Sequence, residues 1–353
     1  MRPAHQSLRV GVPPLLAELT PQTSVGRIWR NVLAGLADLG ARVVVADPGS
    51  RRWAPRRVDV WLTDGHQGPL DVKAPVVAHL HEATWADPQL RPLFEPAFLA
   101  AYEGPSEASA RAARRLITVS ECSKAQIVQA YGRAPGDVDV VPNGIDHATY
   151  RPKLAKAGPL LAAAGGDEAR PYVLFVSVVH PRKNLAVLRD AMAGLAARGY
   201  PHALVLVAGP AADRADSAEL EAEARAPIPG LRTPVVNLAG APDDEVARLM
   251  GGAAAFCLPS LMEGFGMAVV EAMACGAPVV VSDRGALPEV VGDAGIVVPP
   301  TAEAVEAALA DVLGEPVFAA DLSRRGILRA AEFSWERTAR GTLATLTAAT
   351  EAG

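Results

Sequence analysis

Short apolar runs alternate with helix-like segments along most of the chain. The runs are continuously apolar rather than alternating, which is typical of strands buried on both faces of a parallel sheet. The pattern predicts strands at 8–12, 42–46, 58–62, 75–80, 115–119 and 138–141, and further along at 172–178, 203–208, 253–258 and 278–282. Apolar positions with helical spacing predict helices at 25–39, 121–131, 184–198, 243–250 and 267–275.

The alternation is interrupted near the middle of the chain. Residues 142–146 have the composition of a turn, and residues 151–170 are rich in Ala, Gly and Pro. A chain of 353 residues, half of them hydrophobic, is long enough for two cores. We therefore expect an α/β protein with a Rossmann-like domain at 1–150 and a second one at 151–353. Two doubly wound parallel sheets facing a cleft is the simplest architecture, with ligands beyond the carboxyl ends of the strands.

Composition excludes several classes of protein. The formal net charge is -5, so the chain lacks the positive excess of a general nucleic-acid binder. The three cysteines, Cys122, Cys257 and Cys275, do not have the spacing of a metal or redox site, and reduced thiols suit the cytoplasm. No apolar run reaches the roughly 18 to 20 residues of a membrane span. We expect a soluble cytoplasmic protein, in which the basic cluster at 51–57 is either a solvated loop or a peripheral contact with an anionic lipid surface.

Two cations follow the strand predicted at 172–178. Arg182 and Lys183 lie in the loop at its carboxyl end, and Asn184 is placed to cap the next helix. Cations at a helix start oppose the helix dipole, which favours anions there. An anionic ligand at this loop explains the arrangement; an ordinary basic surface turn is the alternative.

A second strand-to-helix junction carries glycines and carboxylates. Gly264 and Gly266 allow a ligand to approach the backbone, and the amides at the start of the following helix favour a diphosphate. Glu263 precedes this helix and Glu271 lies within it. Carboxylates accept strong hydrogen bonds from sugar and ribose hydroxyls. The alternative is that neither glutamate binds a ligand, one of them being structural and the other exposed.

Several segments together resemble the retaining glycosyltransferases of family 4, and in particular mannosyltransferases of that family. The resemblance implies the GT-B fold, with two Rossmann-like domains. It also implies that the last helix, about 335–350, packs back on the N-terminal domain. The glutamate pair with seven intervening residues is its most specific element. The segments that carry the resemblance are 116–123, 141–146, 181–184, 263–271, 278–300 and 333–337.

The resemblance assigns roles to the residues that match. Lys183 and Arg182 would neutralise the donor diphosphate, Glu263 would hold a sugar hydroxyl, and Glu271 would take the ribose hydroxyls. Further donor contacts would come from the segment Gly264, Phe265, Gly266 and Met267 and, in the first domain, from Gly26 and Arg27, which resemble the family's glycine loop.

A histidine in the first half is a further candidate. His81 ends a predicted strand where the family commonly has His-Asp near the sugar and the acceptor, and here Glu82 replaces the aspartate. A packed or solvated histidine is the alternative.

His79 and His81 share a strand face but have no third metal ligand nearby. Residues 137–139, Asp-Val-Asp, are interpreted as a solvated turn. We therefore predict neither a metal nor another cofactor.

The predicted function is the transfer of a hexose from a nucleotide-sugar to an acceptor hydroxyl with retention of configuration. GDP-mannose is the first choice of donor, followed by UDP- and TDP-sugars. The acceptor could be a glycan, a glycolipid or a small molecule, and the oligomeric state is left open. A nucleotide-sugar epimerase of the same fold and a non-catalytic two-lobed binding protein are the alternative functions.

Overall fold

The computed structural model divides the chain into two compact units. The first comprises Met1–Arg91, Pro96–Gly144 and Phe333–Gly353, and the second comprises Pro92–Glu95 and Ile145–Glu332. The structure describes residues 7–19, 23–48, 58–152, 161–162, 170–211, 214–232 and 235–351. The sequence placed the boundary at residue 150, slightly later than the division at Gly144.

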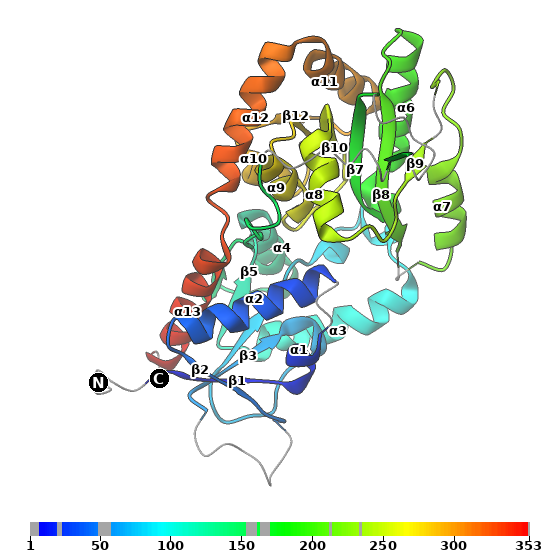
Figure 1. The fold of residues 1–353 in the computed structure, drawn as a ribbon. Coiled ribbons are helices and arrows are strands. Elements are labelled where there is room, and N and C mark those ends of the chain that lie inside the picture. Colours follow the sequence, from blue (N-terminus) through cyan, green and yellow to red (C-terminus); the bar gives the residue numbers. More distant parts are fainter. Residues whose placement is uncertain are drawn as a thin grey trace. The chain divides into compact units, whose positions relative to one another are not determined.

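The first unit is built on a six-stranded parallel sheet in the order β2-β1-β3-β4-β5-β6 (Figure 1). Its central strand β3 is buried along its whole length, whereas the edge strand β2 is partly exposed. Burial on both faces explains the continuous apolar runs of the sequence. The strands are β1 Arg9–Val12, β2 Arg42–Val45, β3 Val60–Asp64, β4 Val76–His79, β5 Arg115–Thr118 and β6 Val138–Val140.

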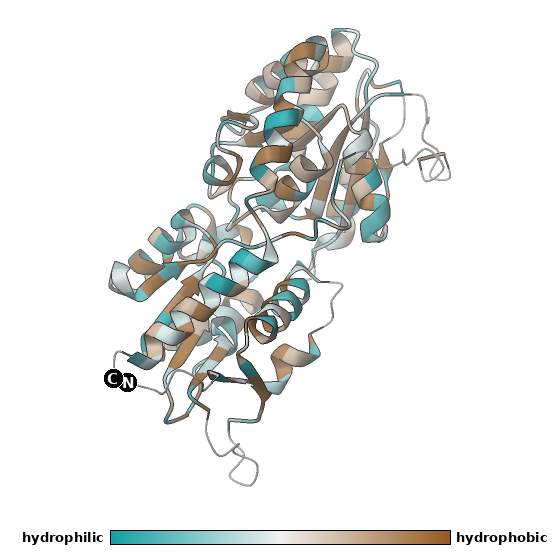
Figure 2. Cartoon of the chain, turned by 60° about the vertical axis from the view of Figure 1, so that its left-hand side comes forward, coloured by the Kyte–Doolittle hydropathy of each residue, from teal (hydrophilic) through white to brown (hydrophobic). Residues whose placement is uncertain are grey.

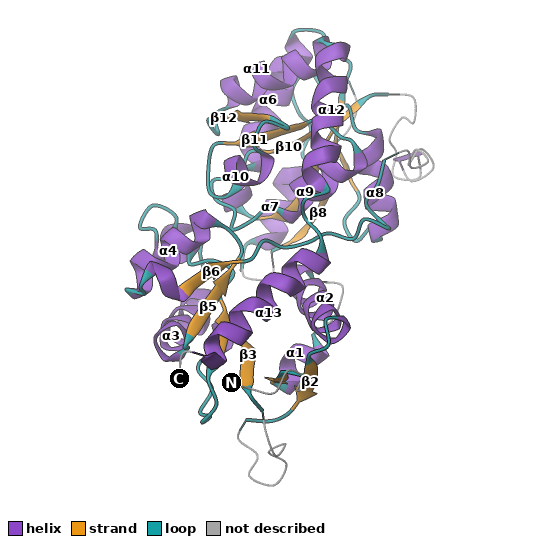
Figure 3. Ribbon diagram, turned by 90° about the vertical axis from the view of Figure 1, so that its left-hand side faces the viewer, coloured by secondary structure: helices purple, strands orange, loops and turns teal. Residues whose placement is uncertain are grey.

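Helices flank the strands of this sheet (Figure 3). The C-terminal helix α13 packs against α2, although some 300 residues separate them along the chain. Gly144, which follows β6, allows the chain there to pack closely against the start of α13, because a Cβ atom on it would lie 2.2 Å from the backbone nitrogen of Trp335. The helices are α1 Pro14–Glu18, α2 Ser24–Asp38, η1 Gly65–Gln67, η2 Thr84–Ala86, α3 Pro96–Ala112, α4 Glu121–Tyr131, η4 Pro135–Asp137 and α13 Trp335–Glu351; η3, Arg91–Leu93, continues into the second unit.

The second unit repeats this architecture with the order β12-β11-β10-β7-β8-β9. The chain runs outward from β7 through β8 to β9, and then returns to β10 on the other side of β7. The loops that follow β7 and β10 therefore leave the same edge of the sheet, side by side. The strands are β7 Tyr172–Val179, β8 Ala203–Pro210, β9 Val236–Asn237, β10 Ala255–Leu258, β11 Val279–Ser282 and β12 Ile296–Val298.

Helix pairs cover this second sheet. Helix α11 packs on α6, and α12 packs on α9. Figure 2 shows apolar strands between helices whose colouring is mixed, as expected for helices with one face on a core. The helices are η5 Pro181–Lys183, α6 Leu185–Ala197, α7 Ser217–Arg225, α8 Asp243–Gly252, α9 Met267–Cys275, α10 Leu287–Val291, α11 Ala302–Gly314 and α12 Pro316–Ala330.

Each strand and helix predicted from the sequence is present, with ends that differ by a few residues. Two short strands, β9 and β12, were not predicted from the sequence. Six α-helices in the described part of the chain were not predicted either, among them α3, which contains Pro105; the others are α1, α7, α10, α11 and α12. The predicted basic cluster at 51–57 and most of the predicted connection at 151–170 lie outside the described residues.

Candidate active site

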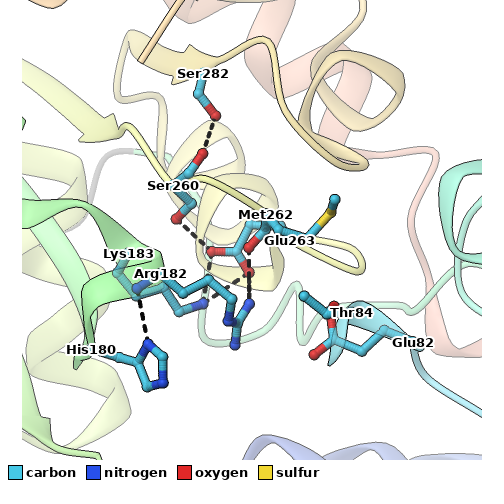
Figure 4. Close-up of polar contacts among 9 residues, drawn as sticks. All are labelled: Glu82, Thr84, His180, Arg182, Lys183, Ser260, Met262, Glu263 and Ser282. Carbon is cyan, nitrogen blue, oxygen red and sulfur yellow. Dashed lines mark hydrogen bonds and ion pairs between the residues drawn. The ribbon is translucent and has the colours of Figure 1, made fainter. Parts of the chain in front are cut away.

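The two junctions singled out in the second half of the sequence come together in the second unit. Figure 4 shows the side chains of Arg182 and Lys183, from the turn after β7, directed at Glu263 from the loop after β10. The pairing of β7 with β10 brings these loops together, since parallel neighbours end at the same edge. Residues 80 positions apart in the chain thus form one polar cluster.

Lys183 and Glu263 form a buried ion pair. The Lys183 Nζ donates to Glu263 Oε1 at 2.7 Å and to Oε2 at 2.9 Å. The two residues are 9% and 7% exposed. Burial of this kind is costly for a charge without a partner, so each side chain depends on the other. The group assigned to the diphosphate and the group assigned to the sugar hydroxyl are thus paired with each other here.

Three further hydrogen bonds join the same two loops. Arg182 Nη1 donates to the Met262 carbonyl at 2.9 Å, and the Arg182 carbonyl accepts from the Leu261 N–H at 2.8 Å. Asn184 Nδ2 donates to the Pro259 carbonyl at 3.1 Å. Asn184 occupies the N-cap position of α6 with a φ of 55°, but its side chain makes no capping bond. The predicted capping role was therefore wrong in this respect, because the side chain joins the loops instead.

Two serines that the sequence analysis did not single out support the Glu263 carboxylate, one directly and the other through the first. Ser260 Oγ donates to Glu263 Oε1 at 2.7 Å, and Ser282 Oγ donates to the Ser260 carbonyl (Figure 4). Burial alone raises the pKa of Glu263, but the charges of Lys183 and Arg182 and the hydrogen bonds from Lys183 and Ser260 outweigh burial and lower it. Glu263 is accordingly an ionised acceptor at neutral pH.

A loop after β11 supports the backbone of Glu263. The Ala286 N–H donates to the Glu263 carbonyl at 2.9 Å. Gly285 has a φ of +62°, and a Cβ atom on it would lie 2.5 Å from the Glu263 carbonyl oxygen and 2.6 Å from its nitrogen. Only glycine fits this contact without displacement of the Glu263 backbone.

The loop after β10 then leads into helix α9. Gly266, with a φ of 92°, is its N-cap, Met267 is its first residue, and Phe265 is buried. The amides at the start of a helix favour an anion. Glu271 lies inside α9 and is 4% exposed. The segment from Gly264 to Met267 thus joins the loop that carries Glu263 to the helix that carries Glu271.

Gly26 and Arg27, which resemble the family's glycine loop, lie at the start of a helix. Both lie in the first turn of α2. The Gly26 N–H donates to the Thr23 side chain at 3.0 Å, and the Arg27 N–H donates to the Thr23 carbonyl at 2.9 Å. Thr23 is an effective N-cap, so the segment that resembles the family's glycine loop lies at the start of the helix predicted at 25–39.

His81 belongs to a group of aromatic residues in the first unit. It follows the end of β4, and its ring centroid lies 4.3 Å from that of His79 and 5.9 Å from that of His66. Glu82, in the position where the family commonly has aspartate, accepts a hydrogen bond from Thr84 at 2.8 Å. His66, which the sequence analysis did not single out, lies in η1 after the neighbouring strand β3.

The Asp-Val-Asp segment has structural partners. Asp137 forms an ion pair with Arg133. Asp139 accepts two hydrogen bonds from Arg115 and one from Thr345 of α13, and so joins two strands to the C-terminal helix. Among the residues described, His, Cys, Asp and Glu side chains do not gather in a group of three or more that could hold a metal ion.

Buried histidines predict a pH dependence of stability. Burial lowers the pKa of His66 to about 4 and that of His79 well below its ordinary value. The unfolded chain takes up protons at these sites below about pH 6.5, whereas folded His66 takes none until about pH 4. The free energy of unfolding should therefore fall over this window, by on the order of 2 to 3 kcal/mol for His66.

Denaturant titrations of the wild-type protein and the His66→Gln variant at several pH values between 7 and 4 would measure this effect. The variant should show a smaller fall over the window, and a variant of the exposed His147 should match the wild type. Equal falls in wild type and His66→Gln would contradict the prediction.

The fold and the site define a class of protein: two doubly wound α/β units, one of which brings two cations and a buried carboxylate together beside the start of a helix. Two family models match the chain, that for glycosyl transferases group 1 over residues 162–329 and that for Glycosyltransferase Family 4 over residues 64–149. The chain belongs to this glycosyltransferase family.

Curated relatives agree with this assignment. The chain is 34% identical over 242 residues to a D-inositol 3-phosphate glycosyltransferase of Segniliparus rotundus, covering 68% of this chain and 53% of the relative. It is 34% identical over 241 residues to an MMP alpha-(1->4)-mannosyltransferase of Mycolicibacterium hassiacum, covering 67% and 54%. The chain thus spans about half the length of these relatives.

Solved structures show the same fold at low sequence identity. A sucrose-phosphate synthase from Thermosynechococcus elongatus matches with a TM-score of 0.74 at 19% identity, covering 98% of this chain and 100% of that one. Anabaena HepE in complex with UDP-glucose matches with a TM-score of 0.72 at 18% identity, covering 97% and 100%. The predicted GT-B fold class is confirmed. No helix in the described part of the chain is long and apolar enough to cross a membrane.

Proposed function

We propose that this protein transfers a hexose from a nucleotide-sugar to an acceptor hydroxyl, with retention of anomeric configuration. The observation that carries the proposal is the cluster of Arg182, Lys183 and Glu263 next to the start of α9. Two cations and a set of helix amides suit a departing nucleoside diphosphate, whose negative charge grows during transfer.

Each part of the site has a chemical role in this proposal. Lys183 and Arg182 stabilise the leaving diphosphate, the α9 amides contact its oxygens, and Glu271 accepts hydrogen bonds from the ribose. Glu263, whose pKa is lowered, remains an ionised acceptor for a sugar hydroxyl. Because the protein cations neutralise the diphosphate, we propose a reaction that requires neither a metal nor another cofactor.

The proposed retention of configuration follows from the contacts of Glu263. The sole glutamate in the cluster is engaged by Lys183 and Ser260, so it is poorly placed to act as a nucleophile on the sugar. A same-face reaction, in which the leaving phosphate helps to deprotonate the acceptor, needs no enzyme nucleophile. Assignment of the product anomer by NMR would test this step, and an inverted anomer would exclude it.

GDP-mannose is the proposed donor, with UDP- and TDP-sugars as the next candidates. Support comes from the mannosyltransferases among the relatives, including an O-antigen chain mannosyltransferase B of Escherichia coli at 30% identity. The UDP-glucose in a structural neighbour supports a nucleotide-sugar donor in general. The proposed acceptor is a glycan, glycolipid or small molecule with a free hydroxyl, and the protein acts in the cytoplasm or at the inner membrane surface.

Calorimetric titration with GDP, UDP, TDP and ADP, with and without EDTA, tests the donor site. One nucleotide should saturate the protein regardless of EDTA, and Glu271→Ala should weaken its binding by about tenfold to a hundredfold. Glu303→Ala, which removes an exposed glutamate of the same unit, is the matched control and should bind normally. Failure of all four nucleotides to bind would remove the basis of the proposal.

A transfer assay with the matching nucleotide-sugar then separates the enzymatic alternatives. A transferase needs an acceptor to consume the sugar, apart from slow hydrolysis. An epimerase would convert the nucleotide-sugar with no acceptor present. A binding protein would do neither, while still saturating with nucleotide.

A further inference from the structure

His66 is held in one orientation by groups from three separate parts of the first unit. It lies directly after β3, where its N–H donates to Asp64 Oδ1 at 2.9 Å. Its Nδ1 lies 2.8 Å from the hydroxyl of Ser106 in α3, and its Nε2 lies 3.3 Å from the backbone nitrogen of His81. Ser106 is fully buried, so this contact is shielded from solvent.

These contacts determine which nitrogen of His66 carries the proton. The backbone N–H of His81 can only donate, so Nε2 of His66 must accept with its lone pair. A neutral imidazole then carries its proton on Nδ1 and donates it to Ser106 Oγ. Burial, which lowers the pKa of His66 to about 4, keeps the ring neutral at physiological pH.

The backbone of His81 depends on side chains because the strand ladder has ended. Strand β4 ends at His79, and the last ladder-like bond is from the Leu80 N–H to the Ile117 carbonyl at 2.9 Å. Beyond it, the His81 N–H donates to His66, and the His81 carbonyl accepts from Thr118 Oγ1 at 3.4 Å. Two side chains thus replace the backbone partners that a longer strand would supply.

The ring of His66 is packed as well as hydrogen-bonded. It is nearly parallel to the ring of His81, with an interplanar angle of 19°, and has Trp85 at 5.5 Å on its edge. The Nε2 atom of His81 itself has no hydrogen-bond partner among the described residues. His66 therefore fixes the main chain and ring plane of a histidine that retains a free polar atom.

We propose that His66 is a positioning residue for transfer: its Nε2 lone pair holds the backbone of His81 so that the His81 imidazole keeps a fixed place for the acceptor. This inference rests on the proposed function. It adds Ser106 as the group that selects the tautomer of His66, and it requires no contact between His66 and the substrate.

Two substitutions of His66 separate positioning from packing. His66→Phe keeps a flat ring but removes the lone pair, and it should lower kcat by about tenfold to a hundredfold, as expected for a small displacement of a reacting group. His66→Gln can place an amide oxygen near the original Nε2 and should recover at least part of the rate. Nucleoside diphosphate affinity should not change in either variant. A His66→Phe variant that folds and keeps the wild-type kcat would overturn the inference.

A double-mutant cycle with His81 gives the sharper test. If His66 acts through His81, then His66→Phe should have almost no further effect on kcat in a His81→Ala background. Multiplicative effects in the double variant would show that the two residues act independently and would overturn the inference. Wild-type protein that binds nucleotide but transfers no sugar would count against the proposed function instead.

Nitrogen-15 NMR of the histidine rings tests the geometry independently of activity. The inference requires an unprotonated Nε2 and a protonated Nδ1 on His66, and the opposite tautomer would overturn it.

The Ser106→Ala variant, a smaller change, provides the test if the His66→Phe variant does not fold. It should shift the tautomer equilibrium and lower kcat by about threefold to tenfold, since one neutral hydrogen bond is lost; an unchanged tautomer and kcat would contradict the inference.

Discussion

Replacement of Lys183 by methionine is expected to lower the free energy of unfolding by about 3 kcal/mol and the transfer rate by about 10² to 10³-fold. The loss of stability follows because Glu263 stays buried and charged. Its remaining polar contacts are Ser260 Oγ at 2.7 Å and the more distant Arg182 Nη1 at 3.8 Å. Urea unfolding and a transfer assay measure the two effects.

The double variant Lys183→Met/Glu263→Gln separates the two effects. It removes both charges, so most of the lost stability should return, whereas the transfer rate should stay as low as in the single variant. A double variant as unstable as the sum of its two single variants would contradict the ion-pair explanation.

The same pair predicts behaviour in acid. Glu263 has a lowered pKa in the folded protein, so its contribution to stability is complete above its ordinary pKa, about 4.5. That contribution should disappear as the pH falls from about 4.5, the ordinary pKa, through the lowered pKa of Glu263 in the folded protein. The double variant should lack this part of the acid dependence.

Gly285→Ala should be nearly as damaging, although Gly285 belongs to neither junction. A Cβ atom at this position would lie 2.5 Å from the Glu263 carbonyl oxygen, and the φ of +62° is strained for alanine. We expect a loss of about 2 to 4 kcal/mol in stability. Nucleotide affinity should fall by at least about tenfold, because the loop before α9 must move.

Gly199→Ala is the matched control for this substitution. Gly199 lies in the same unit with a φ of +88°, but a Cβ atom on it would meet no atom within 4 Å. Its variant should show only the cost of the left-handed conformation, about 1 kcal/mol, and normal nucleotide binding. Equal losses of stability and of nucleotide affinity in the two variants would show that backbone strain, and not the contact with Glu263, causes the effect of Gly285→Ala. Thermal unfolding and calorimetry provide both measurements.

Much of the fold could be predicted because its signals are local. Continuous apolar strands such as 255–258 and 279–282 are buried along their whole length, and the pattern identified both. Strand β9 was missed because only two residues form it, and α3 was missed because Pro105 interrupts its helical pattern. The helix predicted at 25–39 is present as α2, and its first turn, which includes Gly26 and Arg27, follows from the N-cap Thr23.

The sequence by itself determined the α/β class and the resemblance to family 4. It also determined the two strand-to-helix junctions, one with the cations and one with the carboxylates. Each of these depends on residues close together in the chain. The tertiary structure alone decided what those residues contact. Lys183 pairs with Glu263 because β7 and β10 are neighbours in the sheet. Ser282, the last residue of β11, and Gly285, in the loop after it, support that pair. His66 meets His81 because β3 and β4 are also neighbours. Strand order is set by packing across the whole chain, and so no local pattern could determine these contacts.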